Sequence, residues 1–139
     1  MILPAKKSFH WIYVLMGVFA INILALLISR IMLTITINLQ NIIGFTILAL
    51  LVSVIGSIGY FGIRKFSYVF IIFDILGLFY MYFIILSNNS DGWVDLTSLI
   101  GFIVLIDVGI AIGIIAEFIY WIVKRNFSHP RNDRYVKKN

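Results

Sequence analysis

Three acidic residues lie inside long apolar runs of this sequence: Asp74, Asp107 and Glu117. Ionisable side chains in membrane-spanning segments are costly, and they mark proton relays, ion pathways or buried polar contacts. Two carboxyl groups that share a low-dielectric site cannot both ionise cheaply, so a shared proton or a bound cation is favoured. The three residues therefore predict an intramembrane acidic site for protons or cations. The alternative is that each acid is protonated or hydrogen-bonded by a neighbouring helix.

The spacing of the acids along their runs predicts which of them meet. With a rise of about 1.5 Å per residue, Asp74 and Glu117 lie at similar distances from the inner ends of the third and fourth apolar runs. We expect these two carboxyl groups to face each other if the two runs are adjacent helices. Asp107 lies near the middle of the fourth run, and no Lys or Arg lies deep in any run to neutralise it. The polar side chains available as partners are Asn22, Ser29 and His10.

The sequence offers little else that could carry out chemistry. His10 and His129 are its only histidines, and they do not have the spacing of metal ligands. Cysteine is absent, which excludes disulfides and thiolate ligands, and no glycine-rich phosphate loop occurs. We therefore expect no enzymatic activity, no metal site and no cofactor.

The composition indicates that lipid is the solvent for most of the chain. The 139 residues are 62% apolar and 12% charged, whereas soluble domains are about 45–50% apolar and about 25% charged. The net charge of +5 comes from basic residues that flank the apolar runs, where they face lipid headgroups. We therefore expect the bilayer, and not nucleic acid, as the basic residues' partner.

Four apolar runs reach the length of about 20 residues that crosses about 30 Å of hydrocarbon. They are expected to be helices, because lipid offers the backbone no hydrogen bonds. The fold class is therefore all-α, a single transmembrane domain over 1–139 built as an antiparallel, up-down four-helix bundle. The predicted spans are residues 9–29, 42–63, 66–86 and 96–123, followed by a basic cytoplasmic tail over 124–139.

The basic residues also predict the orientation. Lys6 and Lys7, Arg64 and Lys65, and the basic residues after span four fall on one side, while Arg30 falls on the other. By the positive-inside rule both termini are cytoplasmic, in a multi-pass protein of the cell membrane. The high usage of Ile, Asn and Lys is compatible with an AT-rich bacterial genome.

Two loops are expected on the opposite side. Between Thr34 and Gln40 polar and apolar residues alternate, which favours an extended segment at the interface or, alternatively, a helical extension of span one. The second loop covers residues 88–95, and Asp95 at its end is expected to cap span four.

Small residues form stripes on two spans. Gly109 and Gly113 form a Gly-x-x-x-Gly pair that allows close helix approach. Because Asp107 lies on roughly the opposite side, we expect span four at the centre of the bundle, wedged between its neighbours. Packing within one bundle is favoured over a dimer seam. The stripe on span two comprises Ser53, Ser57, Gly56 and Gly59.

The functional hypothesis follows from these features. The minimal loops, the small-residue stripes and the lack of a catalytic set favour a small accessory, regulatory or immunity-type protein that binds another membrane protein or forms a homo-oligomer. The alternative is a proton- or cation-coupled transporter or channel subunit that uses the three acids. Span three is rich in aromatic residues, and a ring-lined pocket near Asp74 would suit an organic cation.

Overall fold

The structure, a computed structural model, describes residues 8–33, 38–87 and 93–127. In these ranges the regular structure is entirely helical, which confirms the all-α prediction, and four helices are long and apolar enough to cross a membrane. The helices are α1 (Trp11–Met32), α2 (Leu39–Gly56), α3 (Arg64–Ser87) and α4 (Val94–Phe127), with a short 3-10 helix, η1 (Ser57–Phe61), after α2.

The predicted spans are close to these helices, with differences at their ends. The predicted second span, 42–63, is α2 followed by η1, and Gly62 ends η1 with a φ of 108°, a left-handed conformation that suits glycine. The predicted extended segment ends inside α2, because Leu39 and Gln40 are already helical. Its residues 34–37 lie outside the described residues. Helix α4 continues to Phe127, so the first residues assigned to the tail are helical, and residues 128–139 lie outside the described ranges.

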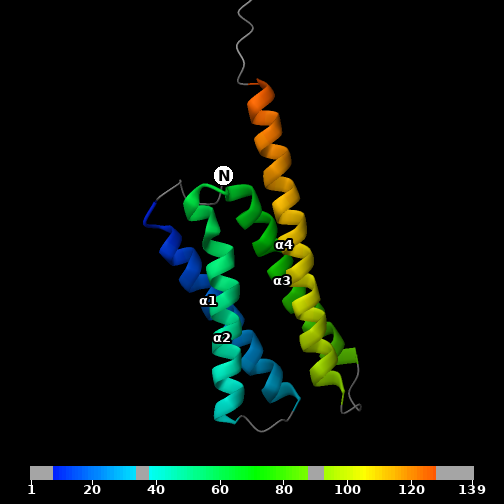
Figure 1. The fold of residues 1–139 in the computed structure, drawn as a ribbon. Coiled ribbons are helices and arrows are strands. Elements are labelled where there is room, and N and C mark those ends of the chain that lie inside the picture. Colours follow the sequence, from blue (N-terminus) through cyan, green and yellow to red (C-terminus); the bar gives the residue numbers. More distant parts are fainter. Residues whose placement is uncertain (1–7, 34–37, 88–92, 128–139) are drawn as a thin grey trace, which may run out of the picture.

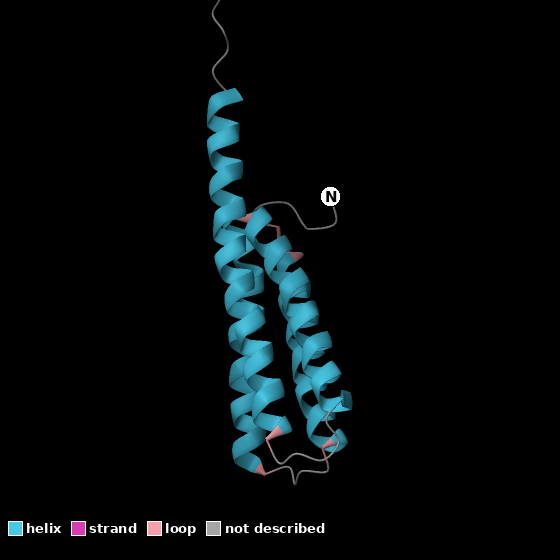
Figure 2. Cartoon of the chain, turned by 90° about the vertical axis from the view of Figure 1, so that its right-hand side faces the viewer, coloured by secondary structure: helices cyan, strands magenta, loops and turns pink. Residues whose placement is uncertain are grey.

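The four helices run antiparallel, up and down, in two side-by-side pairs (Figure 1). Helices α1 and α2 form one pair, and α3 and α4 form the other. The start of α1, the turn between η1 and α3, and the last turns of α4 lie at one end, here called the Glu117 end. The starts of α2 and α4 lie at the opposite end, here called the Asp95 end. Helix α4 extends beyond the other helices at the Glu117 end (Figure 2).

Helix α3, and not α4, is the central helix of the bundle. It packs against α1, α2, η1 and α4, whereas α3 is the only described helix whose backbone α4 approaches closely. On the side of α4 away from α3, residues such as Val104 and Ile115 are exposed. The expectation that span four is wedged at the centre is therefore wrong. A glycine-rich face lets α4 approach α3 closely, and the opposite face of α4 stays exposed.

The contact between α3 and α4 is built from aromatic rings set against glycines. A Cβ atom added to Gly109 would lie 2.5 Å from Cβ of Phe73, and one added to Gly113 would lie 2.7 Å from the ring of Phe66. Real Cβ contacts are not this short, so only glycine allows the present helix separation. The Gly-x-x-x-Gly pair is therefore occupied by α3 of the same chain.

The stripe on α2 also packs within the chain. Gly56 lies against the ring of Phe70, and Gly59 lies against the ring of Trp11. The Ser53 hydroxyl donates to the carbonyl oxygens of Ala49 and Leu50, and the hydroxyl of Ser57, the first residue of η1, donates to that of Ser53. Close contact between α2 and α3 lies near the turn that joins them.

Candidate functional site

Glu117 of α4 caps the start of α3. Its Oε2 atom accepts hydrogen bonds from the backbone N–H groups of Lys65, at 3.0 Å, and Phe66, at 3.2 Å. The first N–H groups of a helix have no partner within the helix, and a carboxylate beside them is stabilised by the helix dipole. Glu117 thus supplies, from another helix, the cap that the sequence before α3 lacks.

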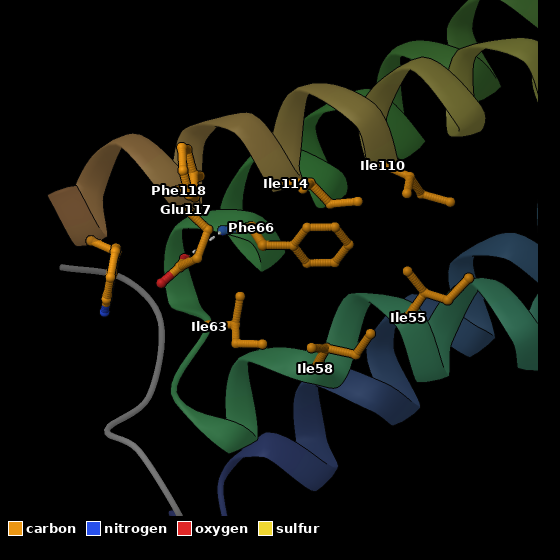
Figure 3. Close-up of a pocket in the computed structure, with 9 residues that line it drawn as sticks. Ile55, Ile58, Ile63, Phe66, Ile110, Ile114, Glu117 and Phe118 are labelled. Carbon is orange, nitrogen blue, oxygen red and sulfur yellow. Dashed lines mark hydrogen bonds between the residues drawn. The ribbon is translucent and has the colours of Figure 1, made fainter.

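An apolar groove opens beside Glu117, between α4 and the α2–η1 segment. Its volume is about 690 Å³. Figure 3 shows Ile55, Ile58 and Ile63 on one side, Ile110 and Ile114 of α4 on the other, and the Phe66 ring between them. These five isoleucines give the isoleucine groove its name. Glu117, Phe118 and Trp121 line its end.

Asp74 is buried between α3 and α1, away from Glu117. Its Oδ2 atom accepts a hydrogen bond of 2.9 Å from Nδ2 of Asn22, which also donates to the carbonyl of Val18 at 3.0 Å. The other carboxylate oxygen of Asp74, Oδ1, and the amide oxygen of Asn22, Oδ1, are both buried with no hydrogen-bond partner among the described residues. A proton on Asp74 would remove its charge and add a donor to this pair.

The prediction that Asp74 and Glu117 face each other is wrong. Glu117 lies beside residues 65 and 66, whereas Asp74 follows eight residues later, about 12 Å further along the helix axis. Phe73, the neighbour of Asp74, contacts Gly109 of α4. Asp74 therefore lies at the depth of Asp107, not of Glu117. The prediction failed because α4 reaches beyond α3 at the Glu117 end.

Asp107 is exposed on the surface of the bundle. It does not meet either of the other acids, and no hydrogen bond or ion pair with another described residue holds its side chain. The three acids thus occupy three environments: a buried pair, a helix cap and an exposed helix face. Within the described residues they do not form a common metal or cation site.

Of the other expected partners, only Asn22 reaches one of the acids. The Ser29 hydroxyl donates to the carbonyl of Leu26 in its own helix, and His10 is exposed and bonded to Ser8. The Tyr82 hydroxyl, which was not among the predicted partners, donates to the Ala25 carbonyl at 2.7 Å and ties α3 to α1.

An ion pair that was not predicted lies at the Asp95 end. Nη1 of Arg30 pairs with Oδ2 of Asp95 at 2.6 Å, and its guanidinium lies 5.1 Å from the ring centre of Phe45. One side chain thereby joins α1, α4 and α2. Asp95 lies in the first turn of α4, where its charge complements the helix dipole, and not before the helix as predicted. The sequence did contain a signal for this pair, because Arg30 and Asp95 carry opposite charges and were expected on the same side of the membrane.

Comparison of the chain with protein-family models, curated proteins and solved structures finds no significant match.

Proposed function

We propose that this protein is an accessory or regulatory protein of the cell membrane that binds another membrane protein through the face of α4 carrying Asp107. The exposure of Asp107 supports this proposal. Asp107 follows Asp95 by twelve residues and precedes Glu117 by ten, so it lies about 15–18 Å along the helix from each. This position corresponds to the centre of a bilayer whose hydrocarbon is about 30 Å thick.

An aspartate at the centre of a membrane helix is costly when it faces lipid. Insertion scales assign it roughly 2.5–3.5 kcal/mol. A partner helix that donates a hydrogen bond to Asp107, or brings a basic side chain to the same depth, removes this cost. The partner we infer is therefore a membrane helix with a polar donor or a basic residue at mid-depth. Adjacent small and apolar residues of α4, such as Ala111, would provide the rest of the contact.

The proposed orientation places the Glu117 end in the cytoplasm, together with both termini. Arg64 and Lys65 begin α3 at this end, and Lys124 and Arg125 lie in the last turns of α4 at the same end. Arg30 lies at the opposite end, where Asp95 pairs with it. This distribution matches the positive-inside rule.

Site-specific photocrosslinking in native membranes tests the proposal. A photoreactive amino acid replaces Ala111, one turn from Asp107 on the same face, and a control protein carries it at Phe79, which is exposed on α3. We expect a discrete adduct with a second protein from position 111 and its loss when Asp107→Leu is added. An adduct of twice the chain mass would assign the face to a homo-oligomer. Identical adducts from both positions, or adducts unchanged by Asp107→Leu, would overturn the proposal.

Proton- or cation-coupled transport is a second candidate, favoured by the buried Asn22–Asp74 pair with its two unpartnered oxygens. A carboxyl group in such a site can take up and release a proton as its surroundings change. Flux of protons or monovalent cations into liposomes that is lost in Asp74→Asn and retained in Asp107→Asn would support transport. Absence of flux by the unmodified protein would remove this candidate.

A further inference from the structure

We propose that the isoleucine groove binds a cationic amphiphile, a molecule with a single alkyl chain and a terminal ammonium group, with the ammonium at Glu117. This inference concerns a small ligand and does not depend on the partner proposed for Asp107.

The charge of Glu117 is available to such a ligand. Two backbone N–H groups hold Oε2, but no Lys, Arg or His nitrogen of the described residues lies within 4.0 Å of the carboxylate. The nearby ammonium of Lys65 instead lies over the ring of Tyr120, 5.5 Å from its centre. The carboxylate is thus stabilised by dipoles and not neutralised by a side-chain charge. A negative charge of this kind in an apolar surround favours a cation at its free oxygen.

Two aromatic rings line the same end of the groove. Phe118 and Trp121 line it together with Glu117, and their rings stack at 6.5 Å. Ring faces attract alkylammonium groups within about 6 Å. Arg125 already lies over the Trp121 ring at 5.4 Å, so we place the ligand's ammonium at the carboxylate, with the rings as secondary contacts.

The apolar part of the groove sets the chain length. From Ile110 to Glu117 α4 advances seven residues, about 10 Å. An extended polypeptide spans about 3.3–3.6 Å per residue, or about 1.2 Å for each of its three backbone bonds. An extended alkyl chain gains a similar length per bond, so about eight to ten carbons fill the groove. The groove lies in the part of the protein that we place in lipid. The tail therefore gains little over the bilayer itself, and selectivity must come from the headgroup.

The order of residues along α4 favours an ammonium over a phospholipid headgroup. Moving toward the Glu117 end, the groove side of α4 presents Ile110, Ile114, Glu117, Trp121 and then, one heptad after Glu117, Lys124. The acid thus lies next to the apolar part and the basic residue further out. A phospholipid places its phosphate nearest the tail, which would meet the carboxylate first. An amphiphile with a terminal ammonium carries no phosphate, so its headgroup presents only a positive charge to the carboxylate of Glu117.

Tryptophan quenching tests the site. The protein in phosphatidylcholine vesicles is titrated with a ten-carbon alkylammonium brominated in its chain, and with the alcohol and the sulfonate of the same chain. We expect saturable quenching by the ammonium alone, and loss of the saturable component in Trp121→Phe. Glu117→Gln should weaken binding about ten-fold or more, as expected for loss of a charged contact. The amide oxygen of Gln can still accept from Lys65 and Phe66, so α3 keeps its cap.

The controls distinguish binding in the groove from partitioning of the amphiphile into the bilayer. Asp107→Asn removes an acid of the same helix outside the groove and should leave the quenching unchanged. Equal quenching by the alcohol, retention of affinity in Glu117→Gln, or loss of affinity in Asp107→Asn would each overturn the proposal. Quenching that falls as the protein-to-lipid ratio rises would show that a second copy's helix fills the groove, and would overturn it too.

Discussion

The carboxylate of Glu117 on α4 caps α3 by accepting the backbone N–H groups of Lys65 and Phe66. This contact predicts a local effect of Glu117→Ala. Loss of a helix N-cap costs about 1 kcal/mol, equivalent to a roughly five-fold change in the local opening equilibrium. We expect faster hydrogen exchange at the amides of residues 65 and 66, measured in micelles. Glu117→Gln should keep their protection, because its amide oxygen can accept the same bonds. Unchanged hydrogen-exchange rates at residues 65 and 66 in Glu117→Ala would show that the cap does not stabilise the start of α3.

The hydrogen bond between Asn22 and Asp74 predicts coupling between α1 and α3. Interhelical hydrogen bonds in membranes contribute about 0.6 kcal/mol on average and up to about 1.7 kcal/mol. Both side chains are buried, so a double-mutant cycle of Asn22→Ala and Asp74→Ala should give a coupling free energy near the upper value. Unfolding in mixed micelles measures it. Asn22→Ala combined with Ser53→Ala is the control, because the Ser53 hydroxyl bonds within its own helix. A coupling free energy of zero for Asn22 and Asp74 would contradict the pairing.

The four long apolar helices could be predicted from the sequence because a membrane span imposes a simple rule on residue types. A helix that crosses hydrocarbon must be apolar over about 20 residues, and such runs are read directly from residue types. The central helix could not be predicted in this way. Since apolar residues predominate on every side of each span, no amphipathic pattern indicates which helix is buried. The two-sided polarity of span four was misleading, because Asp107 faces outward while Gly109 faces α3.

The candidate site was predictable only in its residue types. The acids were identified, and Asn22 was named as an available polar partner for them. The cap at Glu117 could not be foreseen, since its donors are backbone N–H groups, which every residue except proline carries. The isoleucine groove could not be foreseen either. It arises because α4 packs on α3 and leaves α2 uncovered on that side, and isoleucines alone do not indicate a gap between helices.

The proposed orientation predicts a labelling pattern that the cysteine-free chain makes simple to measure. Single cysteines are introduced as Ser8→Cys at the Glu117 end and Asn38→Cys at the Asp95 end. If the Glu117 end is cytoplasmic, a membrane-impermeant maleimide should label position 38 in intact cells and position 8 only after permeabilisation. Asn38 precedes α2 without a side-chain capping bond, so its replacement should not perturb the fold. The reverse labelling pattern would invert the proposed topology.

The ion pair of Arg30 and Asp95 predicts a stability change at the other end of the bundle. The Arg30 side chain is 12% exposed and that of Asp95 32%, so the pair is only partly screened. Removing one partner leaves the other charge partly buried, and we expect Asp95→Asn to cost about 1–2 kcal/mol of unfolding free energy, between the values for exposed and buried pairs. Arg30→Asp alone should lower the unfolding free energy, and the double variant Arg30→Asp with Asp95→Arg, which exchanges the two charges, should recover part of that loss. Unfolding in micelles measures these differences. Equal stability of Asp95→Asn and the unmodified protein would show that the pair contributes nothing.

The close packing of Gly109 against Phe73 predicts that α4 tolerates no side chain at this position. Gly109→Leu would force the helices apart, and overpacking of this kind typically costs about 1–3 kcal/mol. Gly17→Leu and Gly44→Leu are matched controls in α1 and α2, since a Cβ atom at either glycine meets nothing within 4 Å. We expect a clear loss of unfolding free energy in micelles for Gly109→Leu and little change for the controls. The contact between α3 and α1 does not involve Gly109, so Gly109→Leu should detach α4 and leave the Asn22–Asp74 hydrogen bond in place. Persistence of that bond distinguishes detachment of α4 from unfolding of the whole bundle. Equal effects at all three glycines would mean that the substitutions act through general hydrophobicity and not through the contact between α3 and α4.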